Sequence, residues 1–170
     1  MGLFDLFTST KRPETGVPIQ SVTEIRARLL ALNRDTAPYQ LMDGTPEGVD
    51  IIAQWKIVDA KWYEIFAKAG LSKTFKIYLK LDEAQHAVRA KDHEYTVSWR
   101  AGVPNLELNT SSFSGQTQSV EFGAAYGFTE KLSVGEIYNY RFNTGEIKKP
   151  IQAAVTSGGW IYKGVAFGAL

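Results

Sequence analysis

The stretch TFKIYLKL, residues 74–81, alternates apolar and polar side chains in the way that a half-buried β-strand does. Every second position is apolar, namely Phe75, Ile77, Leu79 and Leu81. The positions between them hold Lys76, Tyr78 and Lys80. Successive side chains of a strand point to opposite faces of a sheet, so the first set predicts a face toward a core and the second a face toward water. We use this strand as the reference for the rest of the chain.

Several further stretches have strand patterns. Residues 50–58, DIIAQWKIV, place Ile51, Ala53, Trp55 and Ile57 on one face. Shorter strands are predicted at 39–42, 87–90, 94–99, 106–108, 119–122, 136–142 and 160–167, because Gly, Ser and Asn punctuate the chain between them. This punctuation is typical of an antiparallel sheet. Whether strands 51–58 and 74–81 are instead parallel neighbours, joined across a helix, stays open at this point.

The first predicted helix spans residues 22–33. Ser21 and Glu24 have the spacing of a capping box, in which the hydroxyl and the carboxylate each bond a free backbone N–H of the first turn. Val22, Ile25 and Leu29 then recur on one face of the helix. The start of this helix is therefore well marked by the sequence.

Two further helices are predicted. Residues 60–69 follow Asp59, a good N-cap, and carry Trp62, Ile65, Phe66 and Ala69 at helical spacing. Residues 148–157 form the third helix, which we expect to begin near Lys149 because Pro150 inside a helix would remove a hydrogen bond.

These elements predict an α+β fold with a single twisted antiparallel sheet or partial β-barrel of about seven to nine strands, packed with helices at about 22–33, 60–69 and 148–157. At 170 residues the chain fits one domain, which we place at 19–170. Residues 1–18 are interpreted as an N-terminal arm and linker. We expect this arm to dock on its own domain, and the alternative is that its apolar residues Leu3, Phe4 and Phe7 bind a partner protein or another copy of the chain.

Charge and composition exclude several classes of protein. The 19 basic and 18 acidic residues are interspersed and leave a net charge of +1, so no nucleic-acid partner is expected. The chain has no cysteine, which excludes disulfides and thiolate sites and fits a cytoplasmic location. No apolar run is long enough for a membrane span, and the first residues lack the pattern of a secretory signal.

The two histidines do not predict a metal site. His86 and His93 lie seven residues apart, in stretches that we interpret as turns on either side of a short strand at 87–90. Such turns are too far apart for both imidazoles to bind one metal ion. We therefore expect exposed turn residues, no metal and no cofactor.

No catalytic motif is present, because the chain lacks a G-x-S-x-G elbow, a Walker motif and a G-x-G-x-x-G loop. The preferred hypothesis is a non-enzymatic cytoplasmic binding or scaffold module that uses aromatic-rich surfaces. Tyr138, Tyr140 and Arg141 are its other candidate binding residues, since tyrosine and arginine are frequent in binding hot spots. The alternative is a hydrolase or a small-ligand-binding protein with a pocket between sheet and helices.

Overall fold

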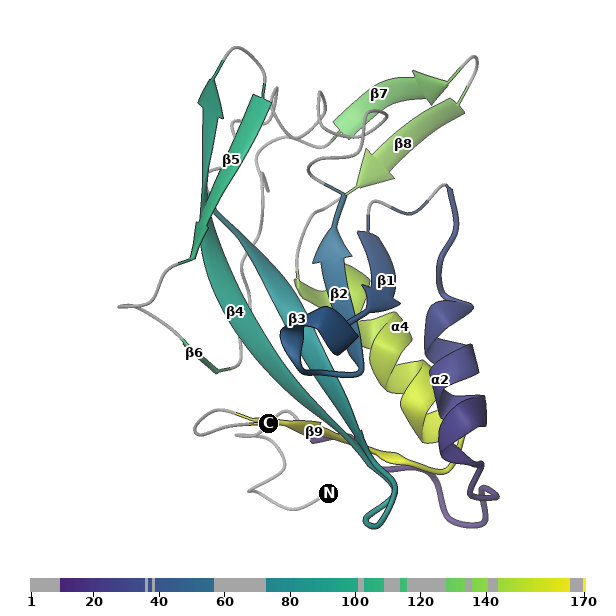
Figure 1. The fold of residues 1–170 in the computed structure, drawn as a ribbon. Helices are drawn as coiled ribbons and strands as arrows, with labels where there is room; N and C mark the ends of the chain where they lie inside the picture. The colour runs from purple at the N-terminus through teal and green to yellow at the C-terminus, as the bar shows by residue number, and fades with distance from the viewer. Residues whose placement is uncertain are drawn as a thin grey trace.

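The described part of the chain folds as an open, mixed β-sheet with two α-helices on one side (Figure 1). The structure, a computed structural model, describes residues 10–35, 37, 39–56, 73–100, 103–108, 114–115, 128–133, 136–140, 144–165 and 170. The α+β class is confirmed. The helix predicted at 60–69 lies outside the described residues, which contain two α-helices in place of the three expected.

Helix α2, Val22–Leu30, begins as the sequence predicts. The backbone N–H of Glu24 donates to Ser21 Oγ, 3.2 Å away, and the backbone N–H of Ser21 donates to Glu24 Oε2 at 2.8 Å, which completes the capping box. Ile25 and Leu29 are fully buried. The helix ends at Leu30, three residues before the expected end at residue 33, and residues 31–32 form a turn.

The chain then forms a compact unit of strand, short helix and strand. Strand β1, Tyr39–Asp43, and strand β2, Ile51–Trp55, pair antiparallel, and the 3-10 helix η1, Thr45–Glu47, lies between them. Gly48 ends η1 with a φ of 78°, a left-handed conformation that glycine adopts without steric cost. Three residues of the predicted inward set of β2 are buried, namely Ile51, Ala53 and Trp55, and the fourth, Ile57, lies outside the described residues. Ile52 and Lys56 of the opposite set are buried as well.

The longest element of the fold is the hairpin of strand β3, Lys73–Asp82, and strand β4, Ala87–Arg100. Ten residue pairs join the two strands, from Lys73↔Thr96 to Asp82↔Ala87. Strand β2 pairs antiparallel with β3, with Ala53 opposite Ile77, so the parallel arrangement that the sequence left open does not occur. The expected pair of short strands at 87–90 and 94–99 is wrong, because β4 runs through both without a turn.

The second edge of β4 carries three short strands in succession. Strand β9, Ile161–Gly164, runs parallel to residues 87–90, while β6, Ser114–Gly115, and β5, Val103–Leu108, pair antiparallel with its later residues. The prediction of a single antiparallel sheet or partial barrel is therefore wrong. The sheet is open along the path β1-β2-β3-β4-β5, and it is mixed because β9 joins β4 in parallel. Strands β7, Phe128–Ser133, and β8, Glu136–Tyr140, pair in a separate sheet.

Helix α4, Thr144–Ser157, corrects the third predicted helix, because it starts before the expected residue 148 and contains Pro150 in its interior. Ile147, Ile151 and Val155 stand at spacings of four residues and are fully buried. The burial of such side chains contributes about 1.5–3 kcal/mol each, which outweighs the cost of about 3 kcal/mol for a helical proline.

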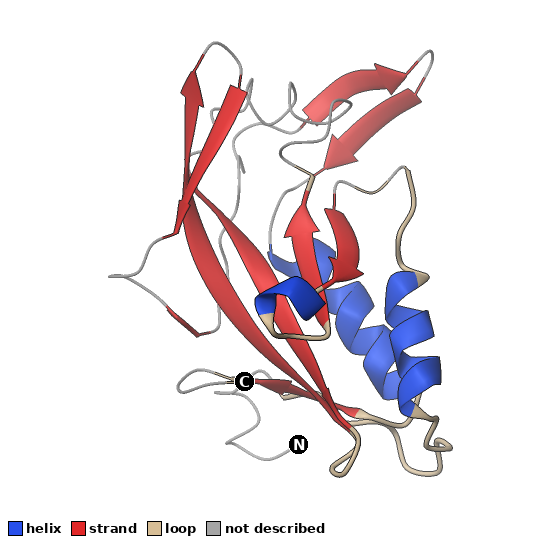
Figure 2. Ribbon diagram, in the orientation of Figure 1, coloured by secondary structure: helices blue, strands red, loops and turns tan. Residues whose placement is uncertain are grey.

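The two helices lie side by side against one face of the sheet (Figure 2). Arg28 of α2 donates to Ser157 Oγ of α4 at 3.2 Å. The core between helices and sheet includes Ile25, Ile77, Leu79 and Trp160. Among the described parts of the chain, no helix is long and apolar enough to cross a membrane.

The described part of the N-terminal arm runs along β9. The N–H of Lys11 donates to the carbonyl of Tyr162 at 2.8 Å, and the N–H of Tyr162 donates back to the carbonyl of Lys11 at 2.9 Å. The indole of Trp160 donates to the carbonyl of Gln20 at 2.8 Å. The apolar residues Leu3, Phe4 and Phe7 lie outside the described residues, and the division of the chain at residue 18 stays a prediction.

Candidate functional site

The alternation of β3 and β4 sends polar and aromatic side chains to the face of the sheet opposite the helices. Lys76 pairs with His93 and Tyr78 pairs with Lys91, and the side chains of paired residues project from the same face. The intervening Ile77 belongs to the core on the other face. This polar face is the one that the sequence assigned to water.

An open pocket of about 430 Å³ lies on this face. It is lined by Glu47, Gly48 and Val49 after β1, by Tyr78 of β3, by Lys91, His93 and Tyr95 of β4, and by Leu170. The volume is within the range of about 300–1,000 Å³ that is usual for small-molecule sites. The expected position of a pocket, between sheet and helices, is not where this pocket lies.

Three rings form the floor of the pocket. The phenol oxygens of Tyr78 and Tyr95 lie 2.9 Å apart and share a hydrogen bond. The imidazole of His93 lies over Tyr78, with ring centroids 4.4 Å apart and ring planes tilted by 60°. The ammonium of Lys76 lies 4.9 Å from the centroid of the Tyr95 ring, which is a cation–π distance.

The pocket keeps these three rings uncharged at neutral pH. Burial raises the pKa of Tyr78, and both the hydrogen bond that it shares with Tyr95 and the nearby Glu47 raise it further. Burial likewise raises the pKa of Tyr95. The pKa of His93 is lowered from 6.5, first by burial and then by the positive charge of Lys91, and these outweigh the opposing effects of Asp92 and Glu47. The pocket therefore offers two phenols and a neutral imidazole, which can donate and accept hydrogen bonds.

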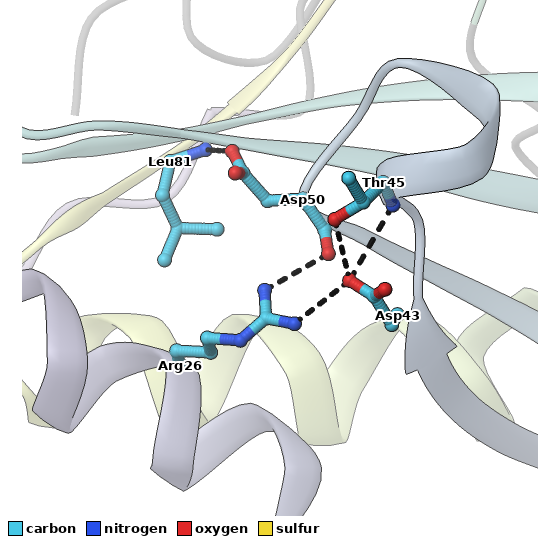
Figure 3. Close-up of polar contacts among 5 residues, drawn as sticks. All are labelled: Arg26, Asp43, Thr45, Asp50 and Leu81. Carbon is cyan, nitrogen blue, oxygen red and sulfur yellow. Dashed lines mark hydrogen bonds and ion pairs between the residues drawn. The ribbon is translucent and has the colours of Figure 1, made fainter.

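A polar network holds the segment that forms one wall of the pocket (Figure 3). Arg26 of α2 donates through Nη2 to Asp43 Oδ1 at 3.0 Å and through Nη1 to the carbonyl of Asp50 at 2.9 Å. Asp43 and Asp50 stand at the two ends of the connection that contains η1, so a single guanidinium forms hydrogen bonds to both ends of this connection. Thr45 Oγ1 also donates to Asp43 Oδ1 at 2.8 Å, and the N–H of Leu81 donates to Asp50 Oδ2 at 2.8 Å.

A buried ion pair lies beneath the other wall. Asp92 stands between Lys91 and His93 in β4 but points to the core, where Asp92 Oδ2 lies 2.6 Å from Lys148 Nζ of α4. Both side chains are buried. Removal of one partner would leave an uncompensated charge in the core, so the pair couples the position of α4 to the strand that carries the pocket residues.

The structure separates the two histidines that the sequence treated alike. His86 lies in the turn between β3 and β4 with a φ of 48°, as expected of a turn residue. The turn expected around His93 is wrong, because His93 lies within β4 and is half-buried in the pocket. Asp92 misled the sequence interpretation, because it occupies an inward position of the alternation, where it forms an ion pair with the distant Lys148.

The candidate residues from the sequence are not among the described residues that line the pocket. Tyr138 and Tyr140 are in β8, opposite Glu130 and Phe128 of β7. Arg141, Leu3, Phe4 and Phe7 lie outside the described residues. The pocket residues that the sequence interpretation passed over are Glu47, Tyr78, Lys91, His93 and Tyr95. The alternation of β3 placed Tyr78 on the outward face, but no sequence pattern near Tyr78 indicates that it contacts Tyr95.

The chemistry of the lining suits binding through rings and hydrogen bonds. Among its side chains, the described lining contains one carboxylate and one imidazole, but no serine. In the part of the chain that the structure describes, no group of three or more His, Cys, Asp or Glu side chains could hold a metal ion. Comparison of the chain with protein-family models, with curated proteins and with solved structures found no match.

Proposed function

We propose that this protein is a non-enzymatic binding module whose open pocket, between η1 and the β3–β4 hairpin, holds a small ligand with a planar ring. The observation that carries the proposal is the hydrogen-bonded pair of Tyr78 and Tyr95 with His93 packed over Tyr78. A planar ligand can stack on an aromatic ring, and such stacking contributes about 1–3 kcal/mol per ring. The neutral phenols and imidazole would select its polar edge.

Binding without catalysis is favoured by the composition of the lining. Hydrolysis requires an activated nucleophile or a pair of carboxylates on either side of the scissile bond, and the side chains of the described lining contain neither. A cytoplasmic location is part of the proposal, since a chain without cysteine suits a reducing compartment. The aromatic surface that we propose differs from the one around Tyr138 and Tyr140 that the sequence favoured.

The proposal is tested by titrating the chain with adenosine, guanosine, uridine and indole while backbone amide chemical shifts are recorded. We expect at least one of these compounds to give saturable shifts at Lys91, His93 and Tyr95. Tyr95→Leu should weaken that binding by about tenfold or more, because it removes a ring. Tyr95→Phe keeps the ring but loses the hydrogen bond to Tyr78, and should weaken binding less.

Lys149→Ala is the control variant, because Lys149 is exposed on α4 and lies on the other side of the sheet. It should bind as the unmodified chain does. The proposed function would be refuted if none of the four compounds binds, or if Tyr95→Leu binds them as tightly as the unmodified chain.

A further inference from the structure

A row of three basic residues crosses the sheet next to the pocket. Lys80 of β3 is opposite Arg89 of β4, and Arg89 is opposite Lys163 of β9. Paired positions project from the same face, so the three cations share the face that carries Tyr78 and Lys91. We call Lys80, Arg89 and Lys163 the basic row. Adjacent strands are about 4.8 Å apart, so the basic row spans about 10 Å.

The basic row places like charges on opposite positions of neighbouring strands. Like charges directly opposite one another on neighbouring strands repel and destabilise a sheet. Lys163 Nζ donates to Gln85 Oε1 at 3.0 Å, and this neutral amide does not cancel its charge. Asp82 and Glu83 are the acidic residues at the same end of the hairpin, and the Asp82 carboxylate accepts from the N–H of Gln85 at 3.2 Å. The row therefore gathers cations that an anionic ligand can bind.

The position of the basic row relative to the pocket defines the ligand. Lys80 is two residues from Tyr78, and Arg89 is two residues from Lys91, which is about 7 Å along the strands. A ligand with its ring on Tyr78 and Tyr95 would therefore extend an attached group over the basic row. Glu47 lines the pocket as the one acidic side chain of its described lining, and its negative charge disfavours an anionic group within the pocket itself.

We propose that the ligand is a nucleoside phosphate, with its base in the pocket and its phosphates on Lys80, Arg89 and Lys163. This inference rests on the proposed function for the base, and adds the basic row as a separate anion site. Three cations spread over the row match a chain of phosphates better than a single carboxylate. Arginine binds phosphate oxygens through two parallel N–H groups, and lysine supplies a strong point charge.

The inference is tested by calorimetric titration with adenosine, AMP, ADP and ATP, and with inorganic tripolyphosphate as the anion alone. We expect ATP to bind at least about tenfold more tightly than adenosine, and the difference to shrink as salt is added. The variant Lys80→Gln, Arg89→Gln, Lys163→Gln should bind ATP no more tightly than adenosine while it still binds adenosine. Lys149→Gln, a change of one exposed lysine on α4, should leave all affinities unchanged.

The outcomes separate the two proposals. If tripolyphosphate binds the basic row but no nucleoside or nucleotide binds, the basic row stands and the proposed base pocket falls. Equal affinities for adenosine and ATP would overturn the basic row as a phosphate site and leave the pocket intact. Should a single-stranded oligonucleotide bind much more tightly than ATP and cover several nucleotides, the assignment to a free nucleoside phosphate is wrong. The melting temperature of the triple variant, which we expect to be unchanged or higher, checks that it folds, and the single variant Lys163→Gln serves if it does not.

Discussion

Asp92 of β4 and Lys148 of α4 form an ion pair of 2.6 Å in the core, directly behind the strand residues that line the pocket. Neither side chain has appreciable access to water. The pair therefore joins the second helix to the longest strand by charge as well as by apolar packing. Its effect on stability can be measured by substitution of each partner alone and of both together.

Asp92→Ala and Lys148→Ala should each lower the free energy of unfolding by about 3–5 kcal/mol, because either change leaves one charge buried without its partner. The double variant Asp92→Leu, Lys148→Met replaces both charges with apolar side chains and should recover most of that loss. Urea denaturation measures all three. Lys149→Ala, at the exposed neighbouring position, should change the stability by less than about 0.5 kcal/mol. A double variant as unstable as the single ones would contradict this interpretation.

Arg26→Ala should lower stability by about 1–3 kcal/mol, because the carbonyl of Asp50 loses a charged donor and the two ends of the η1 connection are no longer joined. It should also weaken binding at the pocket, whose wall that connection forms. Arg26→Lys distinguishes the effect of the positive charge from the effect of the two hydrogen bonds, since lysine keeps the charge but lacks the planar group that bonds both Asp43 and Asp50. Binding can be measured with any ligand that shifts the Tyr95 amide. If Arg26→Ala binds that ligand as tightly as the unmodified chain, the η1 connection does not need Arg26 to form the pocket wall.

Stability should fall as the pH decreases below about 6.5, in part because of His93. Burial and the charge of Lys91 lower the pKa of His93 in the folded protein, so the unfolded chain takes up the proton first. The stabilising contribution is complete above the unfolded pKa and is lost as the pH falls through the folded one. His93→Gln removes the titrating group, so the melting temperature of this variant should drop less between pH 8 and pH 5.5 than that of the unmodified chain. Equal drops in the two proteins would show that the folded and unfolded pKa values of His93 are the same.

Pro150→Ala should raise the free energy of unfolding by about 1–3 kcal/mol. Alanine restores a backbone N–H in the interior of α4 and removes the clash of the proline ring with the preceding turn. Gln152→Ala, at a half-buried position of the same helix, is the matched control and should have a much smaller effect. Chemical denaturation of both variants measures the difference. If Pro150→Ala destabilises the protein, then α4 is kinked at this point in a way that the core requires.

Much of the fold is predictable where a helix begins with a capping motif or where a strand has one apolar and one polar face. The capping box at Ser21 and Glu24 marks the start of α2, because both groups lie within one turn of each other. The alternation in β2 and β3 predicts the buried residues Ile51, Ala53 and Ile77. Such signals need no knowledge of distant residues, since the period of a helix or strand is a property of the backbone itself.

The candidate site was not predictable in the same way, because each part of it depends on residues that are distant in the sequence. Lys80 and Lys163 appeared as scattered lysines in a chain of balanced charge, and only the pairing of β3, β4 and β9 gathers them beside Arg89. Tyr78 is opposite Lys91 and Tyr95 is opposite Thr74, so the hydrogen bond between the two phenols is a contact that only the tertiary structure reveals.

The sequence by itself determined which segments become α2, β2 and β3 and which side of each is apolar, because side-chain periodicity is a local property. The tertiary structure alone decided that β4 continues through Asp92, because this inward carboxylate meets the opposite charge of Lys148 from a distant helix. The same register that buries Asp92 points Lys91 and His93 into the pocket. Strand pairing and burial of charge are relations between distant segments, and for that physical reason no local pattern contains them.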